Sequence, residues 1–131
     1  MLNSVIGNYN IIVITVPGSP ETTHMINEKN LKLCRPDTII VNVGRGYEID
    51  NMALYEAIKE KRIYGCALDV TEPEPLPSNH PLWDEDNAII TPHIAGGMQL
   101  ESTVDNVVDI FIKNLAHYRA GEKLINRIEV F

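Results

Sequence analysis

The chain has 131 residues, of which 44% are hydrophobic and 22% are charged, a balance that is ordinary for one folded domain with a substantial core. Its net charge of −7, with lysine and arginine scattered along the sequence, argues against nucleic-acid binding, which uses concentrated basic surfaces. No apolar stretch approaches the roughly 20 residues of a membrane span. The first residues also lack the basic and apolar segments of a signal peptide. We therefore expect a cytoplasmic protein that does not bind membranes.

Short apolar segments alternate with helical patterns along the chain. In chain order we expect a strand over residues 11–16, a helix over 28–33, a strand over 38–43, a helix over 51–62, strands over 65–68 and 88–90, and a long helix from about 100 to 120. The expected strands are apolar, partly β-branched runs that end near Gly or Pro, a pattern typical of strands buried in a parallel sheet. The sequence thus predicts an α/β fold.

The expected helices rest on capping residues and apolar spacing. Asn27 and Asp50 can each cap the free N–H groups at the start of the helix that follows. Residues 71–81 contain four prolines and can form neither a helix nor a central strand. The last helix has apolar residues at spacings of three and four, which predict one buried stripe. These residues are Leu100, Val104, Val107, Val108, Phe111, Leu115 and Tyr118.

Side chains with useful chemistry follow the expected strands. Arg45, Asp69, Glu74 and His93 each lie at or shortly beyond the end of one of these strands. In open parallel sheets the ligand site lies just beyond the carboxyl ends of the strands, so we expect the four residues at one edge. Together they can bind a carboxylate, orient an imidazole and move a proton. Such a group is typical of a dehydrogenase active site.

Each of these residues also has a purely structural interpretation. Arg45 could be a surface residue of a tight turn, and His93 could be a loop histidine held by hydrogen bonds. Asp69 could cap backbone N–H groups at the start of a loop. The spacing does not decide whether Glu72 or Glu74 faces the histidine.

Metal and disulfide chemistry have no clear pattern in the sequence. His24, His80 and His117 are spread without metal-ligand spacing, so we expect no metal site. Cys34 and Cys66 lack CxxC spacing, and Cys66 sits in an apolar run. We expect two reduced, buried thiols.

Five segments occur in a fixed order: SPETTHMIN, VNVGRG, ALYEAIKEKRIYGCALDV, EPEPLPSNHPLW and ITPHIAGG. In this order they resemble the second half of the NAD-binding domain of the D-isomer-specific 2-hydroxyacid dehydrogenases, with the glyoxylate/hydroxypyruvate reductase-like branch the most similar. The resemblance implies a partial Rossmann-type, doubly wound parallel sheet over residues 1–121, which include the long last helix, and a tail over 122–131. The GxGxxG phosphate loop and most of the substrate domain of such enzymes have no counterpart in these 131 residues.

The resemblance also implies roles for individual residues. Arg45 would bind the substrate carboxylate, and His93 would be the acid/base that acts on the substrate hydroxyl. Glu74 would orient His93, because the catalytic glutamate of the family directly precedes the proline of the EPL motif. Asp69 would contact the nicotinamide carboxamide. The implied cofactor-binding residues are Val16, Pro17, Val43, Gly44, Arg45, Asp69, His93, Ala95 and Gly96.

The function implied by this resemblance is hydride transfer between nicotinamide and a small D-2-hydroxy or 2-oxo acid by an NAD(P)-dependent oxidoreductase, with NAD or NADP as cofactor. Two alternatives stay open: a non-catalytic interaction module, as in the corepressors that resemble this family, and a truncated chain that needs a missing segment. The first expected strand would be an unpaired apolar edge, and the last helix could expose part of its stripe. We therefore also expect self-association or a completing segment.

Overall fold

The computed structural model of the protein describes residues 2–97 and 100–127. The chain divides into two compact units, Met1–Ala95 and Gly96–Phe131. The four strands of the sheet belong to the first unit, and helix α3 (Glu101–Ala120) belongs to the second. The grouping of residues 1–121 as part of one nucleotide-binding domain stays a prediction. Part of the predicted tail, residues 128–131, lies outside the described residues.

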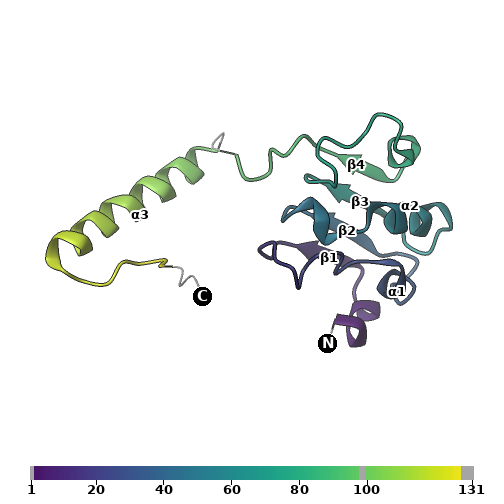
Figure 1. Cartoon of the computed structure of the whole chain (residues 1–131), viewed down its shortest axis with the longest axis horizontal. Helices are drawn as coiled ribbons and strands as arrows, with labels where there is room; N and C mark the ends of the chain where they lie inside the picture. Colours follow the sequence, from purple (N-terminus) through teal and green to yellow (C-terminus); the bar gives the residue numbers. More distant parts are fainter. Residues whose placement is uncertain (1, 98–99, 128–131) are drawn as a thin grey trace. The chain divides into compact units, whose positions relative to one another are not determined.

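A parallel sheet forms the centre of the first unit, with its strands side by side in chain order (Figure 1). The strands are β1 (Ile11–Ile14), β2 (Ile39–Asn42), β3 (Gly65–Leu68) and β4 (Ala88–Ile90). Helix α1 (Glu28–Leu31) follows β1 in sequence, and α2 (Asn51–Lys59) follows β2. Because every neighbouring pair of strands is parallel, the predicted α/β fold with a parallel sheet is confirmed.

The elements begin close to their predicted starts, and several end earlier than predicted. Asn27 and Asp50 cap α1 and α2 as expected. Helix α2 ends at Lys59 rather than at residue 62, because Lys61 has a φ of 57°, in the left-handed region that ends helices. The 3-10 turns η3 (Gly46–Glu48) and η4 (Pro81–Asp84) were not predicted, since three or four residues are too few to show a period.

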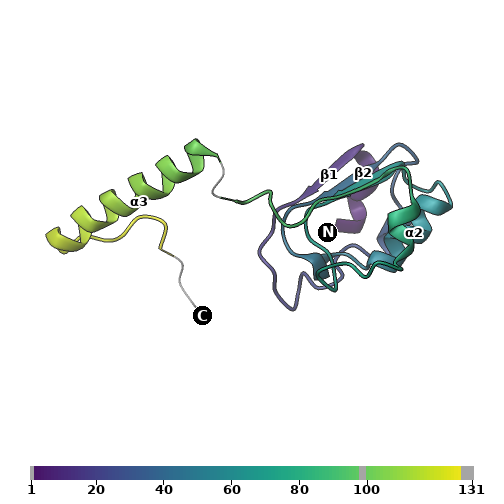
Figure 2. The ribbon, with the colours of Figure 1, turned by 90° about the horizontal axis from the view of Figure 1, so that it is seen from above.

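One face of the sheet carries the core. Ile14, Ile40 and Leu68 point to this face and are at most 4% exposed. They belong to one apolar cluster with Leu31 of α1 and Leu54 of α2. Figure 2 shows α2 on one side of the sheet. Burial of each such side chain stabilises the fold by about 1.5–3 kcal/mol, so packing on this face fixes the positions of the strand ends.

The opposite face of the sheet is open to solvent. Ile11, Val13 and Ile89 alternate with the core-facing residues and are 62%, 56% and 63% exposed. In the described part of the first unit, the helices pack with the core cluster and leave these side chains uncovered. Strand β1 lies at the edge of the sheet, as the sequence predicts.

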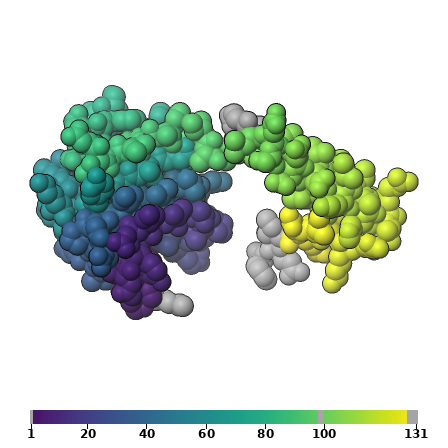
Figure 3. Space-filling view, turned by 180° about the vertical axis from the view of Figure 1, so that it is seen from behind, coloured from purple at the N-terminus to yellow at the C-terminus, as the bar shows by residue number. Residues whose placement is uncertain are grey.

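Helix α3 has no buried residue, so the predicted buried stripe is wrong for this structure. The space-filling view shows its side chains at the surface (Figure 3). Periodicity shows which side of a helix is apolar, but it does not show what covers that side. None of the helices among residues 2–97 and 100–127 is both long and apolar enough to cross a bilayer.

Candidate active site

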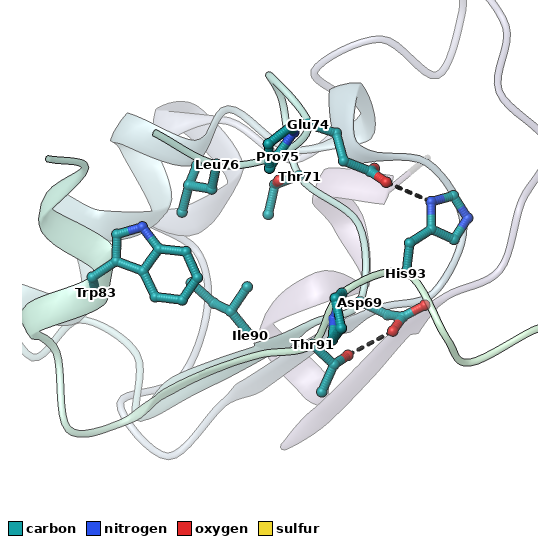
Figure 4. A pocket seen from close by; sticks show the side chains of 10 residues that line it. Asp69, Thr71, Glu74, Pro75, Leu76, Trp83, Ile90, Thr91 and His93 are labelled. Carbon is teal, nitrogen blue, oxygen red and sulfur yellow. Dashed lines mark hydrogen bonds and ion pairs between the residues drawn. The ribbon is translucent and has the colours of Figure 1, made fainter. Parts of the chain in front are cut away.

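Most of the predicted site residues lie beyond the carboxyl ends of the strands. Asp69 directly follows β3, His93 follows β4, and the loop after Asp69 brings Glu74 to the same place (Figure 4). All three line a cavity of about 360 Å³, a size that suits a small ligand. The cavity also has an apolar wall that sequence patterns did not reveal, formed by Pro75, Leu76, Trp83 and Ile90.

A hydrogen-bonded pair joins His93 and Glu74. Nδ1 of His93 lies 2.6 Å from Oε1 of Glu74. The two side chains are 49% and 43% exposed, so the pair is accessible from solvent. Because Nδ1 faces the carboxylate, Nε2 points away from Glu74 (Figure 4). A histidine held in this way can present its second nitrogen to a reacting group and transfer a proton.

His93 has a strained backbone. Its φ of 54° lies in the left-handed region, which residues other than Gly, Asn and Asp seldom adopt. Such a conformation costs on the order of 1–3 kcal/mol and persists where the surroundings hold it. Here the N–H of His93 donates to the backbone oxygen of Asp69 at 2.9 Å. His24 and Lys61 also have a left-handed φ, so this conformation alone does not mark His93 as functional.

The structure separates the roles of Glu72 and Glu74, which sequence spacing left open. Glu74 faces His93, whereas Oε2 of Glu72 lies 3.0 Å from Nε2 of His24. The backbone oxygen of Glu72 also accepts a hydrogen bond from Asn51 of α2 at 2.8 Å. The loop is therefore anchored through both glutamates, with Glu74 at the cavity.

Asp69 braces the loop that carries His93. Its Oδ1 accepts hydrogen bonds from the Thr91 hydroxyl (2.6 Å) and the Ile94 N–H (2.8 Å), and its Oδ2 accepts one from the Ala95 N–H (2.9 Å). Although burial opposes the ionised form, these hydrogen bonds lower the pKa of Asp69. Asp69 thus binds backbone N–H groups of the loop after β4, and not those of the loop that it begins itself. Its predicted contact with nicotinamide stays a prediction.

Arg45 lies in the turn after β2 and is exposed. Its Nη1 donates to the backbone oxygen of Gly44 at 2.8 Å. Gly46 is required in this turn, because a Cβ at that position would overlap the backbone oxygen of Thr71. The turn therefore packs directly on the loop that leads to Glu74. Arg45 itself is not among the residues that line the cavity.

The predicted cofactor-binding residues are spread along the same sheet edge. Three are exposed beyond the ends of β1 and β2: Val16, Pro17 and Val43. Gly44 is buried in the turn before Arg45. Ala95 ends the first unit and Gly96 begins the second. Apart from Gly96 itself and its two chain neighbours, no described residue has an atom within 4 Å of the place that a Cβ on Gly96 would occupy, so a close approach at this glycine stays a prediction.

Two buried polar residues beneath the Arg45 turn were not identified from the sequence. Asn42 and Glu48 are both 0% exposed. The available signal was local: Asn42 is a polar residue in an otherwise apolar strand, and Glu48 lies two residues before the cap of α2. A polar side chain at such an inward position is buried only when it binds something.

Parallel strands in chain order, with polar groups beyond their carboxyl ends, place the first unit in the class of Rossmann-type nucleotide-binding folds. Comparison with known proteins narrows this class. The sequence profile described as "D-isomer specific 2-hydroxyacid dehydrogenase, NAD binding domain" matches residues 1–95. The chain belongs to this family, as its sequence motifs predict.

Individual relatives agree with this family. The chain is 45% identical to a glyoxylate reductase of Thermofilum pendens over 121 residues, which are 92% of this chain and 35% of the relative. It is 39% identical to a glyoxylate reductase of Pyrococcus furiosus over 121 residues, which are again 92% of this chain and 35% of the relative. A solved D-isomer specific 2-hydroxyacid dehydrogenase from Xanthobacter autotrophicus Py2, in complex with NADPH and MES, aligns with a TM-score of 0.83 and 32% identity, over 98% of this chain and 51% of that one. The chain thus spans between 35% and 51% of these relatives.

Proposed function

We propose that this chain forms part of an NAD(P)-dependent oxidoreductase that acts on a small D-2-hydroxy or 2-oxo acid. The observation that carries the proposal is the His93–Glu74 pair, 2.6 Å apart, at the carboxyl edge of the sheet. Arg45 supports the substrate class, because a guanidinium can bind a carboxylate through two parallel hydrogen bonds. The names of the archaeal relatives, glyoxylate reductases, support the same class.

The cofactor of this reaction is NAD or NADP in our proposal. The residues fit a dinucleotide in two respects. Val16 and Val43 expose apolar surface at the strand ends, where a flat ring can pack. Asp69 uses three of the roughly four acceptor positions of a carboxylate, which leaves one for an amide N–H. The residues that we assign to cofactor contacts are Val16, Pro17, Val43, Gly44, Arg45, Asp69, His93, Ala95 and Gly96.

Three side chains have separate roles in the reaction of the 2-hydroxy or 2-oxo acid substrate. Arg45 holds the substrate carboxylate. His93 donates a proton from Nε2 to the C2 oxygen during reduction and takes it back during oxidation. Glu74 holds the ring through Nδ1, so that Nε2 is directed to the reacting group. Bound nicotinamide supplies or accepts the hydride.

We also propose that the chain works with a completing segment or a second copy of itself. The exposed residues Ile11 and Val13 on edge strand β1 support this, since an apolar edge is a template for further pairing. The exposed apolar side of α3 supports it as well, and it equally favours the alternative of a non-catalytic interaction module. Light scattering that gives a mass of 14.7 kDa at all micromolar concentrations would contradict self-association.

A cytoplasmic location is part of the same proposal. Cys34 and Cys66 are both free thiols, although only Cys66 is buried as predicted and Cys34 is partly exposed. Reducing compartments keep such thiols reduced. Burial raises the pKa of Cys66 to about 12, so this residue remains an unreactive thiol. Cell fractionation with an antibody against the chain tests the location.

The function is tested with a chimera in which this chain replaces the aligned segment of the Thermofilum pendens glyoxylate reductase. We expect the chimera to oxidise NADH or NADPH with glyoxylate or hydroxypyruvate, and isothermal titration to show which cofactor it prefers. We expect the 131-residue chain alone to bind dinucleotide weakly, because its sequence has no GxGxxG loop for the pyrophosphate. A chimera that folds and binds cofactor without turnover would instead favour the interaction module.

A further inference from the structure

Glu48 is a buried carboxylate that has no part in the chemistry proposed above. Its side chain is 0% exposed. Among the described residues, its Oε1 has no hydrogen-bond partner. A fully buried carboxylate costs free energy unless its oxygens are well bound, and Glu is seldom buried without a partner. The groups that this carboxylate binds should therefore explain why it is buried.

The carboxylate of Glu48 holds the turn that carries Arg45. Its Oε2 accepts the backbone N–H of Arg45 at 2.9 Å. From the other side, Asn42 accepts the N–H of Gly44 at 2.9 Å and donates to the backbone oxygen of Arg45 at 2.8 Å. Two side chains that are both 0% exposed thus bind three backbone groups of two adjacent residues. We call Asn42 and Glu48 the arginine clamp.

The guanidinium is tied to the same turn. Nη1 of Arg45 donates to the backbone oxygen of Gly44 at 2.8 Å, so the direction of the head group depends on the backbone below it. A Cβ at Gly44 would overlap Oε2 of Glu48, which shows that the carboxylate packs directly against the turn. Glu48 can therefore set the direction of an exposed side chain from a position that no ligand reaches.

We propose that Glu48 is a positioning residue: with Asn42, it holds the Arg45 guanidinium in the orientation that binds a substrate carboxylate. This inference rests on the proposed function of Arg45. An arginine whose guanidinium is already oriented loses less conformational entropy when an anion binds. The arginine clamp therefore strengthens carboxylate binding without contacting the substrate.

The orientation of Arg45 is tested by NMR of the 131-residue chain with Glu48→Leu and Glu48→Gln. Leucine removes the acceptor, whereas glutamine keeps one. We expect Glu48→Leu to lower the order parameter of Arg45 Nε below about 0.6, the range of flexible groups, and Glu48→Gln to restore the wild-type value. Amide exchange at Leu54, whose N–H bonds to Asp50 O in α2, reports whether each variant is folded.

An unchanged order parameter in folded Glu48→Leu would overturn the proposal. If slow exchange at Leu54 is lost in this variant, Asn42→Asp replaces it. That substitution keeps the acceptor for Gly44 but removes the donor to Arg45 O, and the same order parameter decides the outcome.

Carboxylate binding is tested with oxalate as the probe, through the shift of the Arg45 Nε–H signal. We expect oxalate to bind Glu48→Leu about tenfold more weakly than wild type, because misplacement of a binding group weakens recognition. Glu48→Gln should stay within about twofold of wild type. Equal binding by wild type and Glu48→Leu would overturn the inference. If oxalate does not shift the Arg45 Nε–H signal of the wild-type chain, the proposed function of Arg45 is contradicted. The order parameter would still decide whether Glu48 and Asn42 hold Arg45 in place.

Discussion

Two His–Glu pairs in this molecule look alike in isolation. His93 lies 2.6 Å from Glu74, and His24 lies 3.0 Å from Glu72. All four side chains are between 43% and 49% exposed, and both histidines have a left-handed φ, of 54° and 47°. Both glutamates come from one loop. Yet His93 and Glu74 line the cavity, whereas the other pair does not.

The pairs differ in what holds the histidine. The N–H of His93 bonds to the backbone of Asp69 at the end of β3, and the Asp69 carboxylate braces the next two residues. His24 instead lies in the connection between β1 and α1, where its N–H bonds to Tyr47 O at 2.8 Å. An exposed ion pair contributes only about 0–1 kcal/mol to stability. The cavity beside His93 and Glu74, and not the pair itself, therefore marks the candidate acid/base.

The largest expected effect separates the two histidines. In the chimera, His93→Asn should lower turnover by roughly 10²–10⁴-fold, because it removes the proton donor. His24→Asn is the matched control and should leave turnover within about twofold, since this exposed pair does not line the cavity. Steady-state oxidation of the reduced cofactor with glyoxylate measures both. Equal losses in the two variants would contradict a special role of His93 in proton transfer.

The next largest effect concerns the hydrogen bonds between the Asp69 carboxylate and the loop that carries His93. Asp69→Asn should lower the free energy of unfolding by about 2 kcal/mol at pH 7, because it weakens hydrogen bonds to a buried carboxylate. The pKa of Asp69 is lowered in the folded protein, so its contribution is present above the unfolded value of about 3.9 and is lost as the pH falls through the folded value. Urea unfolding of the 131-residue chain at pH 7 and near pH 3 measures the contribution of Asp69 and its loss at low pH.

Asp37→Asn is the matched control for Asp69→Asn. A hydrogen bond from Arg35 lowers the pKa of Asp37 as well, but the pair is about half exposed. We expect Asp37→Asn to lower the free energy of unfolding much less than Asp69→Asn does, because solvent screens the pair. A similar loss in both variants at pH 7 would mean that the Asp69 hydrogen bonds contribute no more than a surface contact.

Local sequence signals account for much of this fold and for part of the site. The apolar runs at Gly65–Leu68 and Ala88–Ile90 predict β3 and β4 with their observed bounds, and parallel pairing then brings Asp69 and His93 to one edge. Spacing alone did not predict the partner of His93, because Glu72 and Glu74 are two residues apart and their directions depend on the folded loop; the family resemblance selected Glu74. Glu48 was missed because its burial depends on the turn above it.

The smallest expected effect separates the two glutamates. In the chimera, Glu74→Gln keeps a side chain that can hydrogen-bond to Nδ1 of His93 but replaces the carboxylate with a neutral amide. We expect turnover of a 2-oxo acid to fall by about tenfold, because the ring is then held less firmly in the orientation that presents Nε2 to the substrate. Steady-state oxidation of the reduced cofactor measures this loss.

Glu72→Gln makes the same replacement in the same loop and is the control for this loss. Its carboxylate binds His24, so turnover should stay within about twofold of wild type. If Glu72→Gln lowers turnover while Glu74→Gln does not, the acid/base is oriented by the other carboxylate, and the loop takes a different conformation in the working enzyme. If both variants lower turnover equally, the 2.6 Å contact with Glu74 has no special part in proton transfer.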